Sequence, residues 1–457
     1  MSHSPIAAII LAAGQGTRMK SALPKVLHKI AGLEMIGHVT AAASALAPER
    51  LSVVIGAHGE QIKTYLGEHA SNAAIAVQDP PQGTGDGVAK AVPHLDGFSG
   101  AVLVLYADTP LIEPSTLQAL VREIEEGASV AVLGFTPPEP GAYGRLKRDD
   151  DGTLAAIVEA KDASPDEYAI TLCNSGVMAF DAKFLSAHIG DLDNKNAKGE
   201  YYLTDLVAIA RQHGKSCGIV EGDNDEVIGV NSRIELAEAE AIFQFNARVS
   251  AMENGATLTD PDTVYFSHDT KIGKDVIIGP NVIFGTGVSV ADNVEVKPFS
   301  HLEGTNIGEG ASIGPFARLR PGANLQAGAK IGNFVEIKKA DIGAGAKVSH
   351  LSYIGDATIG ADANIGAGTI TCNYDGYAKH HTSIGEGAFI GSNSSLVAPV
   401  KIGERAYVGS GSVITKNVVD GDLAVARGRQ AAISGWAEKF HQTHAKKANK
   451  ESSDKNE

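Results

Sequence analysis

The stretch "KIGKDVIIGPNVIFGTGVSVADNVEVKPFSHLEG", residues 271–304, has an apolar residue at every sixth position, often followed by glycine. Three hexads of this kind form one coil of a parallel β-helix, and the apolar residue of each hexad points inward. We therefore predict a left-handed parallel β-helix of hexapeptide repeats over residues 256–440. With single-residue slips, the inward positions are Ile272, Ile278, Phe284, Val290, Val296, Leu302, Ile307, Ile313, Leu319, Leu325, Ile331, Ile337, Ile342, Val348, Ile354, Ile359, Ile365, Ile384, Ile390, Leu396, Ile402, Val408 and Ile414.

The first half of the chain has a different pattern, in which short apolar runs alternate with helical stretches such as residues 115–127. The runs occupy residues 7–13, 50–56, 73–78, 101–108 and 129–135. Apolar strands between helices are typical of a mostly parallel sheet covered on both faces, and ligands bind at the carboxyl ends of such strands. We predict a Rossmann-like α/β domain over residues 1–231.

Three other segments complete the organisation of the chain. Residues 232–255 contain few helix breakers before Gly255, so we expect one long linking helix. The segment "TCNYDGYAKHHTS", residues 371–383, interrupts the repeat, and insertions in solenoids are often binding loops. Residues 441–457 are polar without an apolar period, and we expect this tail to be disordered.

Composition limits the possible partners and the cellular location. The net charge of −15 argues against general binding to nucleic acid or to anionic membranes. The three cysteines are widely spaced, which favours a reducing compartment over a disulfide framework. The apolar start "IAAIILAAG" lacks a basic segment before it and indicates a strand rather than a signal peptide. We expect a cytoplasmic protein without membrane insertion, because no apolar run reaches ~20 residues.

A glycine-rich loop follows the first strand, in "LAAGQGTRMKSALPK", residues 11–25. Backbone N–H groups in such a turn can bind phosphates. The loop lacks the ending of a P-loop and the third glycine of a dinucleotide fingerprint, so a plain turn remains possible. Arg18 and Lys25 suit a triphosphate, although solvated loop charges would look the same.

Further motifs match a known family in order and spacing. They are "LAAGQGTRM", "LPKVL", "QGTGD", "LYADTPLI", "YGR", "VEAKDA", "NSGV", "EYYLTD" and "VIGVNSR" in the first half, and "RLRPGA", "VEIKKA", "SHLSYIGD", "NIGAGTITCNYDG" and "GSNSSLVAPV" in the second. Over about 430 residues the chain resembles the bacterial bifunctional N-acetylglucosamine-1-phosphate uridylyltransferase / glucosamine-1-phosphate acetyltransferase family. Its first domain would thus be a nucleotidyltransferase of the pyrophosphorylase type.

For uridylyl transfer, the resemblance implies attack of the sugar phosphate on UTP with loss of pyrophosphate. Asp108 and Asn231 would hold Mg²⁺, and Arg18 and Lys25 would bind the phosphates and act in catalysis. Asp108 alone could be a cap, and Tyr202 and Thr204 could serve only packing and capping. The implied contacts of UDP-N-acetylglucosamine are Leu11, Ala12, Ala13, Gly14, Lys25, Gln78, Gly83, Thr84, Tyr106, Ala107, Asp108, Gly144, Glu159, Asn174, Tyr202, Thr204 and Asn231.

For acetyl transfer, the resemblance makes His350 the general base, although a lone histidine is usually an ordinary surface residue. Glucosamine-1-phosphate would be bound by Arg320, Lys338, Tyr353 and Asn364, unless these residues form only a charged corner of the solenoid. The implied acetyl-CoA contacts are Ala367, Asn373, Tyr374, Ser392, Ser410 and Arg427.

The resemblance also implies a homotrimer with acetyl-transfer sites between neighbouring β-helices. Acetylation would come first, and uridylylation would then give UDP-N-acetylglucosamine for peptidoglycan and lipopolysaccharide. The chain departs from the family pattern at Asp86, where histidine is usual, and at Ser232, where asparagine is expected. Asp86 puts in doubt which polar groups line the pocket near the nucleotide base.

Two other functions are compatible with parts of this pattern. A sugar-nucleotide pyrophosphorylase could carry a purely structural β-helix, but such a helix would not need His350, Arg320, Lys338, Tyr353 and the inserted loop together. A non-catalytic scaffold that binds sugar nucleotides would not need Asp108, Lys25 and Asn231.

Overall fold

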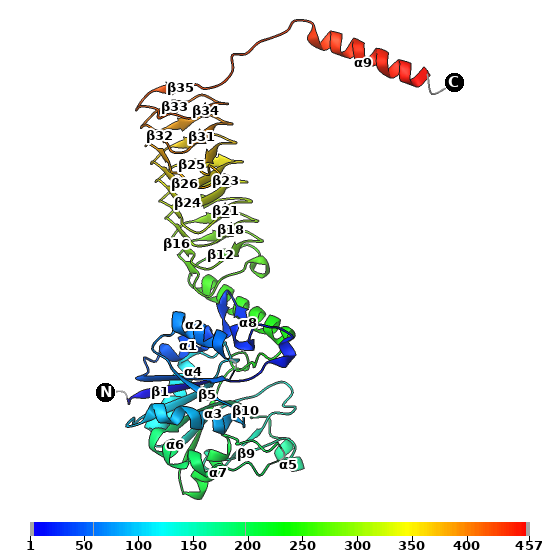
Figure 1. Ribbon diagram of the computed structural model, residues 1–457. Helices are drawn as coiled ribbons and strands as arrows, with labels where there is room; N and C mark the ends of the chain where they lie inside the picture. The colour runs from blue at the N-terminus through cyan, green and yellow to red at the C-terminus, as the bar shows by residue number, and fades with distance from the viewer. Residues whose placement is uncertain (1–3, 58, 197, 454–457) are drawn as a thin grey trace. The chain divides into compact units, whose positions relative to one another are not determined.

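A computed structural model of the chain describes residues 4–57, 59–196 and 198–453 (Figure 1). The chain divides into two compact units, one up to Val288 and one from Ser289 onward, and each is described by itself. Within the described ranges, no helix combines the length and apolar character needed to cross a membrane.

The first unit is built on a sheet with the strand order β11-β7-β10-β6-β1-β4-β5. Strand β1 is parallel to β4 and to β6, whereas β10 is antiparallel to both β6 and β7. The predicted mostly parallel sheet is therefore confirmed, with one antiparallel strand that the apolar pattern did not reveal. The strands are β1 (Ile6–Ala12), β4 (Arg50–Gly56), β5 (Ala74–Gln78), β6 (Ala101–Tyr106), β7 (Val130–Phe135), β10 (Cys173–Asp181) and β11 (Cys217–Glu221).

Helices cover both faces of this sheet, which explains its nearly continuous apolar strands. In β1, Ala8 and Ile10 belong to one core, and Ala7 and Ile9 belong to the core on the opposite face. The first core also contains residues of α1 (Met35–Ser44), α2 (Glu60–His69) and α4 (Pro114–Glu125), and the second contains residues of α3 (Thr84–Ala91), α6 (Ala182–His188) and α7 (Asp205–Gln212).

Shorter elements connect the main ones. Strands β8 (Arg145–Arg148) and β9 (Leu154–Val158) form an antiparallel pair that joins β10, and β2 (Lys29–Ile30) pairs with β3 (Leu33–Glu34). The other short elements are η1 (Thr17–Met19), η2 (Lys25–Leu27), η3 (Val92–Leu95), α5 (Pro165–Tyr168) and η4 (Ile189–Asp191).

The expected linking helix is α8, Arg233–Glu253. It begins at Ser232, whose side chain accepts a hydrogen bond from the Glu235 amide, so serine serves as an N-cap where asparagine was expected. It ends before Gly255, whose φ of +100° takes a conformation that favours glycine. The repeat then starts within the first unit with β12 (Thr257–Leu258), η5 (Pro261–Thr263), β13 (Lys271–Ile272), β14 (Ile277–Ile278) and β15 (Ile283–Phe284).

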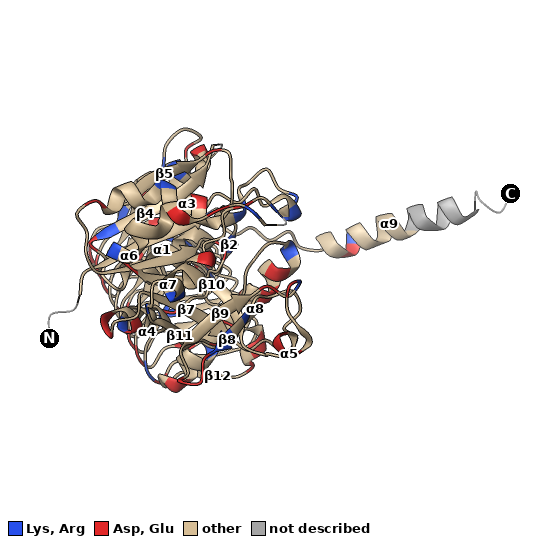
Figure 2. Cartoon of the chain, turned by 90° about the horizontal axis from the view of Figure 1, so that it is seen from below, with Lys and Arg blue, Asp and Glu red and all other residues tan. Residues whose placement is uncertain are grey.

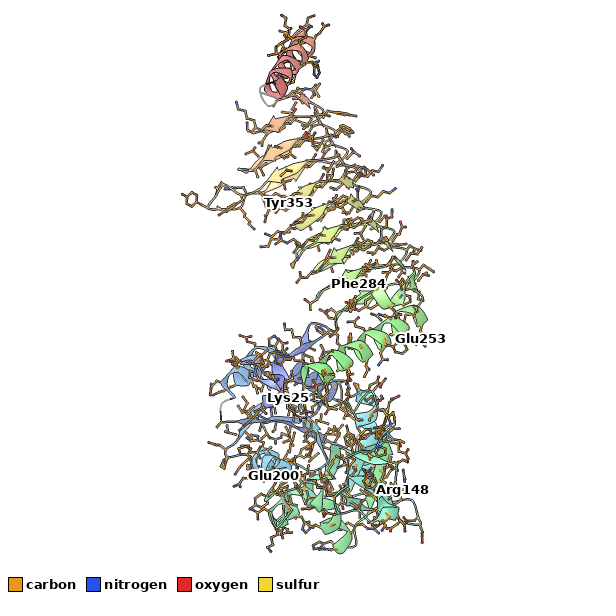
Figure 3. The ribbon with its side chains drawn as sticks, turned by 90° about the vertical axis from the view of Figure 1, so that its right-hand side faces the viewer. Lys25, Arg148, Glu200, Glu253, Phe284 and Tyr353 are labelled. Carbon is orange, nitrogen blue, oxygen red and sulfur yellow. The ribbon has the colours of Figure 1, made fainter. Side chains whose placement is uncertain are left out.

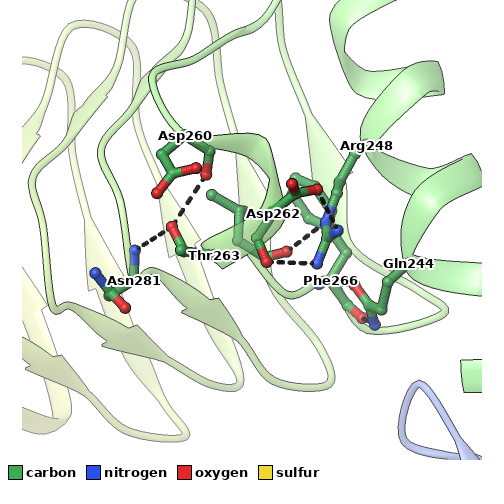
Figure 4. A network of polar contacts seen from close by, with 8 residues as sticks. Gln244, Arg248, Asp260, Asp262, Thr263, Phe266 and Asn281 are labelled. Carbon is green, nitrogen blue, oxygen red and sulfur yellow. Dashed lines mark hydrogen bonds and ion pairs between the residues drawn. The ribbon is translucent and has the colours of Figure 1, made fainter. Parts of the chain in front are cut away.

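Side chains of α8 hold the first coil of the repeat through backbone groups (Figure 4). Gln244, which is 2% exposed, donates from Nε2 to the Phe266 carbonyl at 2.7 Å and accepts from the Phe266 amide at 2.8 Å. One turn later, Arg248 donates to the carbonyls of Val264 and Asp262. The helix therefore satisfies backbone groups that the irregular start of the first coil leaves without strand partners.

Replacing Gln244 with leucine should lower the free energy of unfolding of the first unit by about 2–6 kcal/mol. The substitution leaves the buried amide and carbonyl of Phe266 without partners, and each such group costs about 1–3 kcal/mol. Urea unfolding followed by circular dichroism measures this loss. Gln61→Leu on the exposed side of α2 is the matched control, and equal midpoints for the two variants would contradict the role given to Gln244.

The second unit continues the repeat with very short parallel strands stacked coil on coil (Figure 1). Ser289 pairs with Asn306 and Ser312 with Lys330, so partners are 17 or 18 positions apart. The predicted inward residues from Ile278 to Ile414 are all buried, and Ile272 is half-buried. The hexapeptide prediction is therefore confirmed.

The strands of one wall are β17 (Glu295–Val296), β20 (Ser312–Ile313), β23 (Lys330–Asn333), β25 (Lys347–His350), β27 (Asn364–Ile365), β30 (Phe389–Ile390), β33 (Tyr407–Val408) and β35 (Leu423–Ala424). The remaining strands are β16 (Ser289–Val290), β18 (His301–Leu302), β19 (Thr305–Ile307), β21 (Arg318–Leu319), β22 (Ala323–Leu325), β24 (Glu336–Ile342), β26 (Tyr353–Ile359), β28 (Ile370–Cys372), β29 (Thr382–Ile384), β31 (Ser395–Val397), β32 (Val400–Ile402) and β34 (Val413–Ile414).

One corner of the coils carries an exposed aromatic ladder, which we define as Phe299, Phe316 and Phe334. Successive rings are stacked, with centroids 4.9 and 5.0 Å apart, and each ring is about half exposed. All three residues have a positive φ, a conformation that costs a bulky residue about 1–2 kcal/mol. The ladder therefore places large apolar side chains outside the core at an energetic cost.

The end of the chain differs from the prediction. The last strand, β35, ends at Ala424 rather than near residue 440, and α9 spans Trp436–Ser453. The structure thus has a helix over residues 441–453, where the sequence predicted disorder, and residues 454–457 lie outside the described part. The tail lacks a core, but its alanines and lysines favour helix locally and it contains neither glycine nor proline after Gly435.

Candidate functional site

A cavity of about 470 Å³ lies at the carboxyl ends of β1, β5 and β6 in the first unit. It is the edge at which a parallel sheet binds its ligands. The structure brings many of the predicted nucleotide contacts together there: the lining includes Leu11, Ala12, Ala13, Gly14, Lys25, Gln78, Gly83, Thr84, Tyr106, Asp108 and Tyr202.

Lys25 links three separate segments at this cavity. Its ammonium group forms an ion pair with Asp108 and donates to Oδ1 of Asn231 at 2.9 Å. Gly16 makes this possible, because a Cβ on Gly16 would lie 2.5 Å from the Cβ of Lys25. The glycine-rich loop therefore packs directly on the lysine, which is 8% exposed and lies on η2.

Asp108 and Asn231 fit a small oxygen-binding cation. The Asn231 amide NH₂ donates to the Gly229 carbonyl, so its side-chain oxygen faces Lys25 and Asp108. The backbone fixes the pair, because the amide of Val230 donates to the Asp108 carbonyl at 2.8 Å. Two oxygen ligands suit Mg²⁺, which keeps several waters. Within the described ranges no cluster of three or more His, Cys, Asp or Glu residues forms an alternative metal site.

Tyr106 places a neutral hydroxyl beside this charged group. Burial, and then the nearby Asp108 carboxylate, raise the pKa of Tyr106 to about 12. Its hydroxyl therefore stays protonated at neutral pH and can donate a hydrogen bond. Gly176 allows the chain to pass the ring closely, since a Cβ there would lie 3.1 Å from it.

A second group of predicted residues meets at Gly144. The amide of Asn174 donates to the Gly144 carbonyl at 2.8 Å, and Glu159, directly after β9, approaches Gly144. Arg145, which is 1% exposed, holds this loop by donating to the carbonyls of Pro140, Tyr143 and Gly141. Three of the predicted UDP-N-acetylglucosamine contacts, Gly144, Glu159 and Asn174, thus lie close together in the structure.

Besides Asn231 and the group around Gly144, three further predicted residues are absent from the cavity lining. Arg18 is exposed on η1, and Ala107 is buried with its amide donating to the Leu11 carbonyl. Thr204 occupies the N-cap position of α7 but makes no capping bond through its side chain. The Thr204 hydroxyl therefore does not cap α7, which was the alternative role considered from the sequence.

Lys198 and Glu200 also line the cavity and were not among the predicted contacts (Figure 3 labels Lys25 and Glu200). Glu200 opens the motif "EYYLTD", which could have indicated it. Lys198 lies in a polar loop, and no motif around it could have indicated a ligand contact. Figure 2 shows Lys and Arg segments interspersed with Asp and Glu segments along the chain.

In the second unit, four predicted residues stand in one row on consecutive coils: His350, Ala367, Ser392 and Ser410. Each follows an inward residue of the same wall by two positions. Backbone bonds join the row, for example from the Gly411 amide to the Ser392 carbonyl at 2.8 Å. Arg427 extends it by donating from Nη1 to the Ser410 carbonyl at 2.7 Å. The row offers a long surface track that begins at the histidine.

Asn333 orients His350. Its side-chain oxygen lies 2.6 Å from Nδ1 of the imidazole. Because an amide oxygen only accepts, Nδ1 carries the proton and Nε2 presents a free lone pair. His350 is exposed, so this lone pair can reach a substrate. Nε2 of His350 can therefore accept a proton. Asn333 was not among the site residues predicted from the sequence.

A cation cluster, which we define as Arg320, Lys338 and Lys379, lies at the inserted loop. Lys338 is close to Lys379 of that loop, which lowers the pKa of Lys338, with further contributions from burial and from Arg320. Arg320 also pairs with Glu336 at 2.7 Å. Like charges gathered in this way are stabilised by an anion such as a phosphate monoester. Lys379 is a candidate contact that the sequence analysis missed.

The inserted loop has an ordered conformation. Asp375 accepts hydrogen bonds from the amides of Ala378 and Tyr377 and from Nε2 of His380, and these bonds hold its pKa well below the usual range. At the base of the loop, Asn373 is buried and donates to Tyr353 and Asp356. Tyr374 is 60% exposed, so its ring is available to a ligand.

The predicted acetyl-transfer residues occupy two different walls of the chain. Arg320, Lys338 and Tyr353 lie on or beside β21, β24 and β26, whereas His350 and Asn364 lie on β25 and β27. A hollow of about 320 Å³ contains His350 and Asn333, and another of about 420 Å³ contains Tyr353 and Glu336. Neither of these two hollows contains both His350 and the cations Arg320, Lys338 and Lys379.

Comparisons with known proteins match both halves of the chain. A MobA-like NTP transferase domain matches residues 8–173, and the bacterial transferase hexapeptide family matches residues 269–304 and 381–416. A protein of Paramagnetospirillum magneticum, Bifunctional protein GlmU, is 56% identical over 454 residues, which cover 99% of this chain and 100% of that protein. The protein of the same name in Parvibaculum lavamentivorans is 55% identical and covers 98% and 99%.

Proposed function

Because the chain belongs to the GlmU family of bifunctional proteins, we propose that the sites described above carry its two transfer reactions. The protein is a glucosamine-1-phosphate acetyltransferase and an N-acetylglucosamine-1-phosphate uridylyltransferase, and together these activities make UDP-N-acetylglucosamine. The full-length identity to GlmU proteins, across both domains, is the observation that carries this conclusion.

Uridylyl transfer is assigned to the cavity of the first unit. A phosphate oxygen of N-acetylglucosamine-1-phosphate attacks the α-phosphorus of UTP, a new P–O bond forms, and pyrophosphate leaves with the electrons of the broken bond. Lys25 balances phosphate charge, while the Gly144 cluster positions the sugar. Asp108 and Asn231 would hold Mg²⁺, which when bound supplies charge neutralisation for the triphosphate. Lys25 must then turn from the carboxylate towards the phosphates.

Acetyl transfer is assigned to the row that begins at His350. The amine of glucosamine-1-phosphate attacks the thioester carbonyl of acetyl-CoA, a C–N bond forms, and the C–S bond breaks. Nε2 of His350 accepts the amine proton, and CoA leaves as thiol after protonation. Ala367, Ser392, Ser410 and Arg427 would hold acetyl-CoA along the row, and Arg320, Lys338 and Lys379 would bind the sugar phosphate.

A homotrimer completes this proposal. The base and the cation cluster lie on different walls, so a neighbouring chain is needed to bring the two groups to one substrate. The exposed aromatic ladder adjoins the hollow lined by Tyr353 and Glu336, and large outward apolar residues mark protein interfaces. A C₃ assembly would bury the ladder and join the wall of one chain to the wall of the next.

The free cysteines and the substrates suit a cytoplasmic location.

Phe334→Glu should convert the trimer to a smaller species and abolish CoA release, because a charge in the ladder opposes its burial. Pyrophosphate release from supplied N-acetylglucosamine-1-phosphate should persist. Light scattering coupled to size exclusion measures the mass, and Ile277→Glu provides a control at another exposed apolar position. A monomeric wild type with full acetyl transfer would disprove the shared site.

The function itself is tested with wild-type protein, glucosamine-1-phosphate, acetyl-CoA, UTP and Mg²⁺. Thiol and pyrophosphate are measured separately, and both should form in amounts that equal the UDP-N-acetylglucosamine produced. A second reaction supplies N-acetylglucosamine-1-phosphate directly, so that pyrophosphate release does not depend on acetyl transfer. Pyrophosphate release there, without thiol release in the first reaction, would leave the repeat as an assembly module. Absence of pyrophosphate in the second reaction would reject uridylyl transfer.

A further inference from the structure

Asp86, one of the two departures from the family pattern, contacts a predicted nucleotide-binding residue. It lies in the first turn of α3, where an acidic residue is favourable for the helix. One carboxylate oxygen accepts a hydrogen bond from Nε2 of Gln78 at 2.8 Å. The other lies 3.5 Å from Nζ of Lys90, one helical turn further on. The carboxylate is therefore held between an amide and an ammonium group.

These contacts determine which end of the Gln78 amide faces the cavity. Nε2 also donates to the Gly83 carbonyl at 2.8 Å, so both of its hydrogens are used within the chain. The reversed amide would place Oε1 against two oxygen atoms, neither of which can donate. Gln78 is 5% exposed, so little of its side chain is open to water that could compensate such a reversal. Oε1 is therefore the atom presented to a ligand.

The surroundings of Oε1 support this arrangement. Gln78 is part of the cavity lining together with Gly87 and Leu11. A Cβ on Gly87 would lie 3.4 Å from Oε1 and 3.2 Å from Cδ2 of Leu11. The glycine next to Asp86 thus leaves space beside the amide oxygen. The two consecutive residues Asp86 and Gly87 respectively orient the amide and keep its oxygen accessible.

We propose that Asp86 is a positioning residue that selects uracil over cytosine by fixing Gln78 with its oxygen towards the base. This inference rests on the proposed uridylyl transfer and concerns the specificity of the same cavity. Uracil has a hydrogen on N3 that can be donated to Oε1. Cytosine has a lone pair on N3, which would face the lone pairs of the oxygen. A buried acceptor discriminates strongly when the wrong ligand leaves it unpaired.

Aspartate fixes the amide more strictly than the histidine usual in the family. An ionised carboxylate is only an acceptor, whereas a histidine nitrogen can donate or accept according to its tautomer. The carboxylate also forms a charge-assisted hydrogen bond with the amide, which is stronger than a neutral one. We therefore expect this chain to discriminate against CTP through the pair of Asp86 and Gln78.

The experiment compares kcat/KM for UTP, CTP and 5-methyl-UTP, with N-acetylglucosamine-1-phosphate and Mg²⁺. Asp86→Leu removes the acceptor, and the UTP/CTP ratio should fall about tenfold, the effect of roughly one hydrogen bond. Asp86→Asn loses the charge but keeps an acceptor, so its ratio should stay within about twofold to threefold of wild type. The ratio of UTP to 5-methyl-UTP should not change in either variant, because both bases present the same N3 hydrogen.

Two controls separate specificity from stability. Lys90→Ala removes the ion pair but leaves the contact to Gln78, and its UTP/CTP ratio should match wild type. Acetyl transfer and the melting temperature verify that Asp86→Leu is folded. A folded Asp86→Leu with the wild-type UTP/CTP ratio, or an equal fall in Asp86→Asn, would overturn the proposal. Failure of the wild type to use UTP would instead reject the proposed uridylyl transfer.

Discussion

Asp108→Asn will lower pyrophosphate release from UTP and N-acetylglucosamine-1-phosphate by about 10²- to 10³-fold. The carboxylate faces Asn231 and shares Lys25 with it, so it is the main negative charge available to hold a cation against the triphosphate. The amide that replaces it keeps the shape but loses this charge. The effect should appear mainly in kcat, because the charge of the phosphates changes as the bond to pyrophosphate breaks.

The measurement is a coupled assay of pyrophosphate at saturating Mg²⁺, with acetyl transfer followed in the same preparation. Thiol release should remain within about twofold of wild type, because the two reactions use different units. Asp96→Asn is the matched control, since this aspartate is exposed after η3 and does not line the cavity. A loss in both reactions would indicate misfolding, and a loss below tenfold would contradict the role assigned to Asp108.

His350→Ala will lower CoA thiol release by about 10²- to 10⁴-fold, the usual contribution of a general base. The remaining rate should rise with pH, because the substrate amine must then lose its proton without the imidazole. Uridylyl transfer from supplied N-acetylglucosamine-1-phosphate should be unaffected. Thiol detection at fixed acetyl-CoA, over a range of pH, measures both the loss and its pH dependence.

Two further variants make this test specific. Asn333→Ala removes the acceptor that keeps the proton on Nδ1, so acetyl transfer should fall by about tenfold with KM for acetyl-CoA unchanged. His301→Ala changes an exposed histidine on β18 and should leave the rate intact. If His350→Ala retained more than a tenth of the activity, another group would have to accept the proton.

The β-helix could be predicted in detail because its signal is repeated and local. An inward residue such as Ile313 or Ile365 has the same environment in every coil. The repeat is therefore recognised from many equivalent positions, and one atypical residue does not hide it. The five apolar runs predicted in the first unit correspond to β1, β4, β5, β6 and β7. Strand β10 was not among them, and its antiparallel direction has no signal in composition, because a strand buried on both faces has the same composition in either direction.

The candidate site was predictable where a residue belongs to a motif and was missed where it depends on distant contacts. Asp108 lies two residues after the end of β6, within "LYADTPLI", so its position at the cavity followed from sequence order. The contact between Asp86 and Gln78 requires knowing how α3 packs against β5. Lys379 lies 41 positions after Lys338, and only the path of the inserted loop brings the two lysines together.

The nearly constant spacing of strand partners also determines how the second unit can fold. Most pairs join residues 17 or 18 positions apart, so each coil closes a loop of the same modest length on the coil before it. A solenoid of this kind can grow from any nucleus by adding neighbours, and its folding rate should exceed that of sandwiches with distant pairings. At the inserted loop, Ala357 pairs with Thr382, 25 positions further on. The longer closure costs only about 0.3 kcal/mol in chain entropy, so the inserted loop interrupts the repeat without halting its propagation.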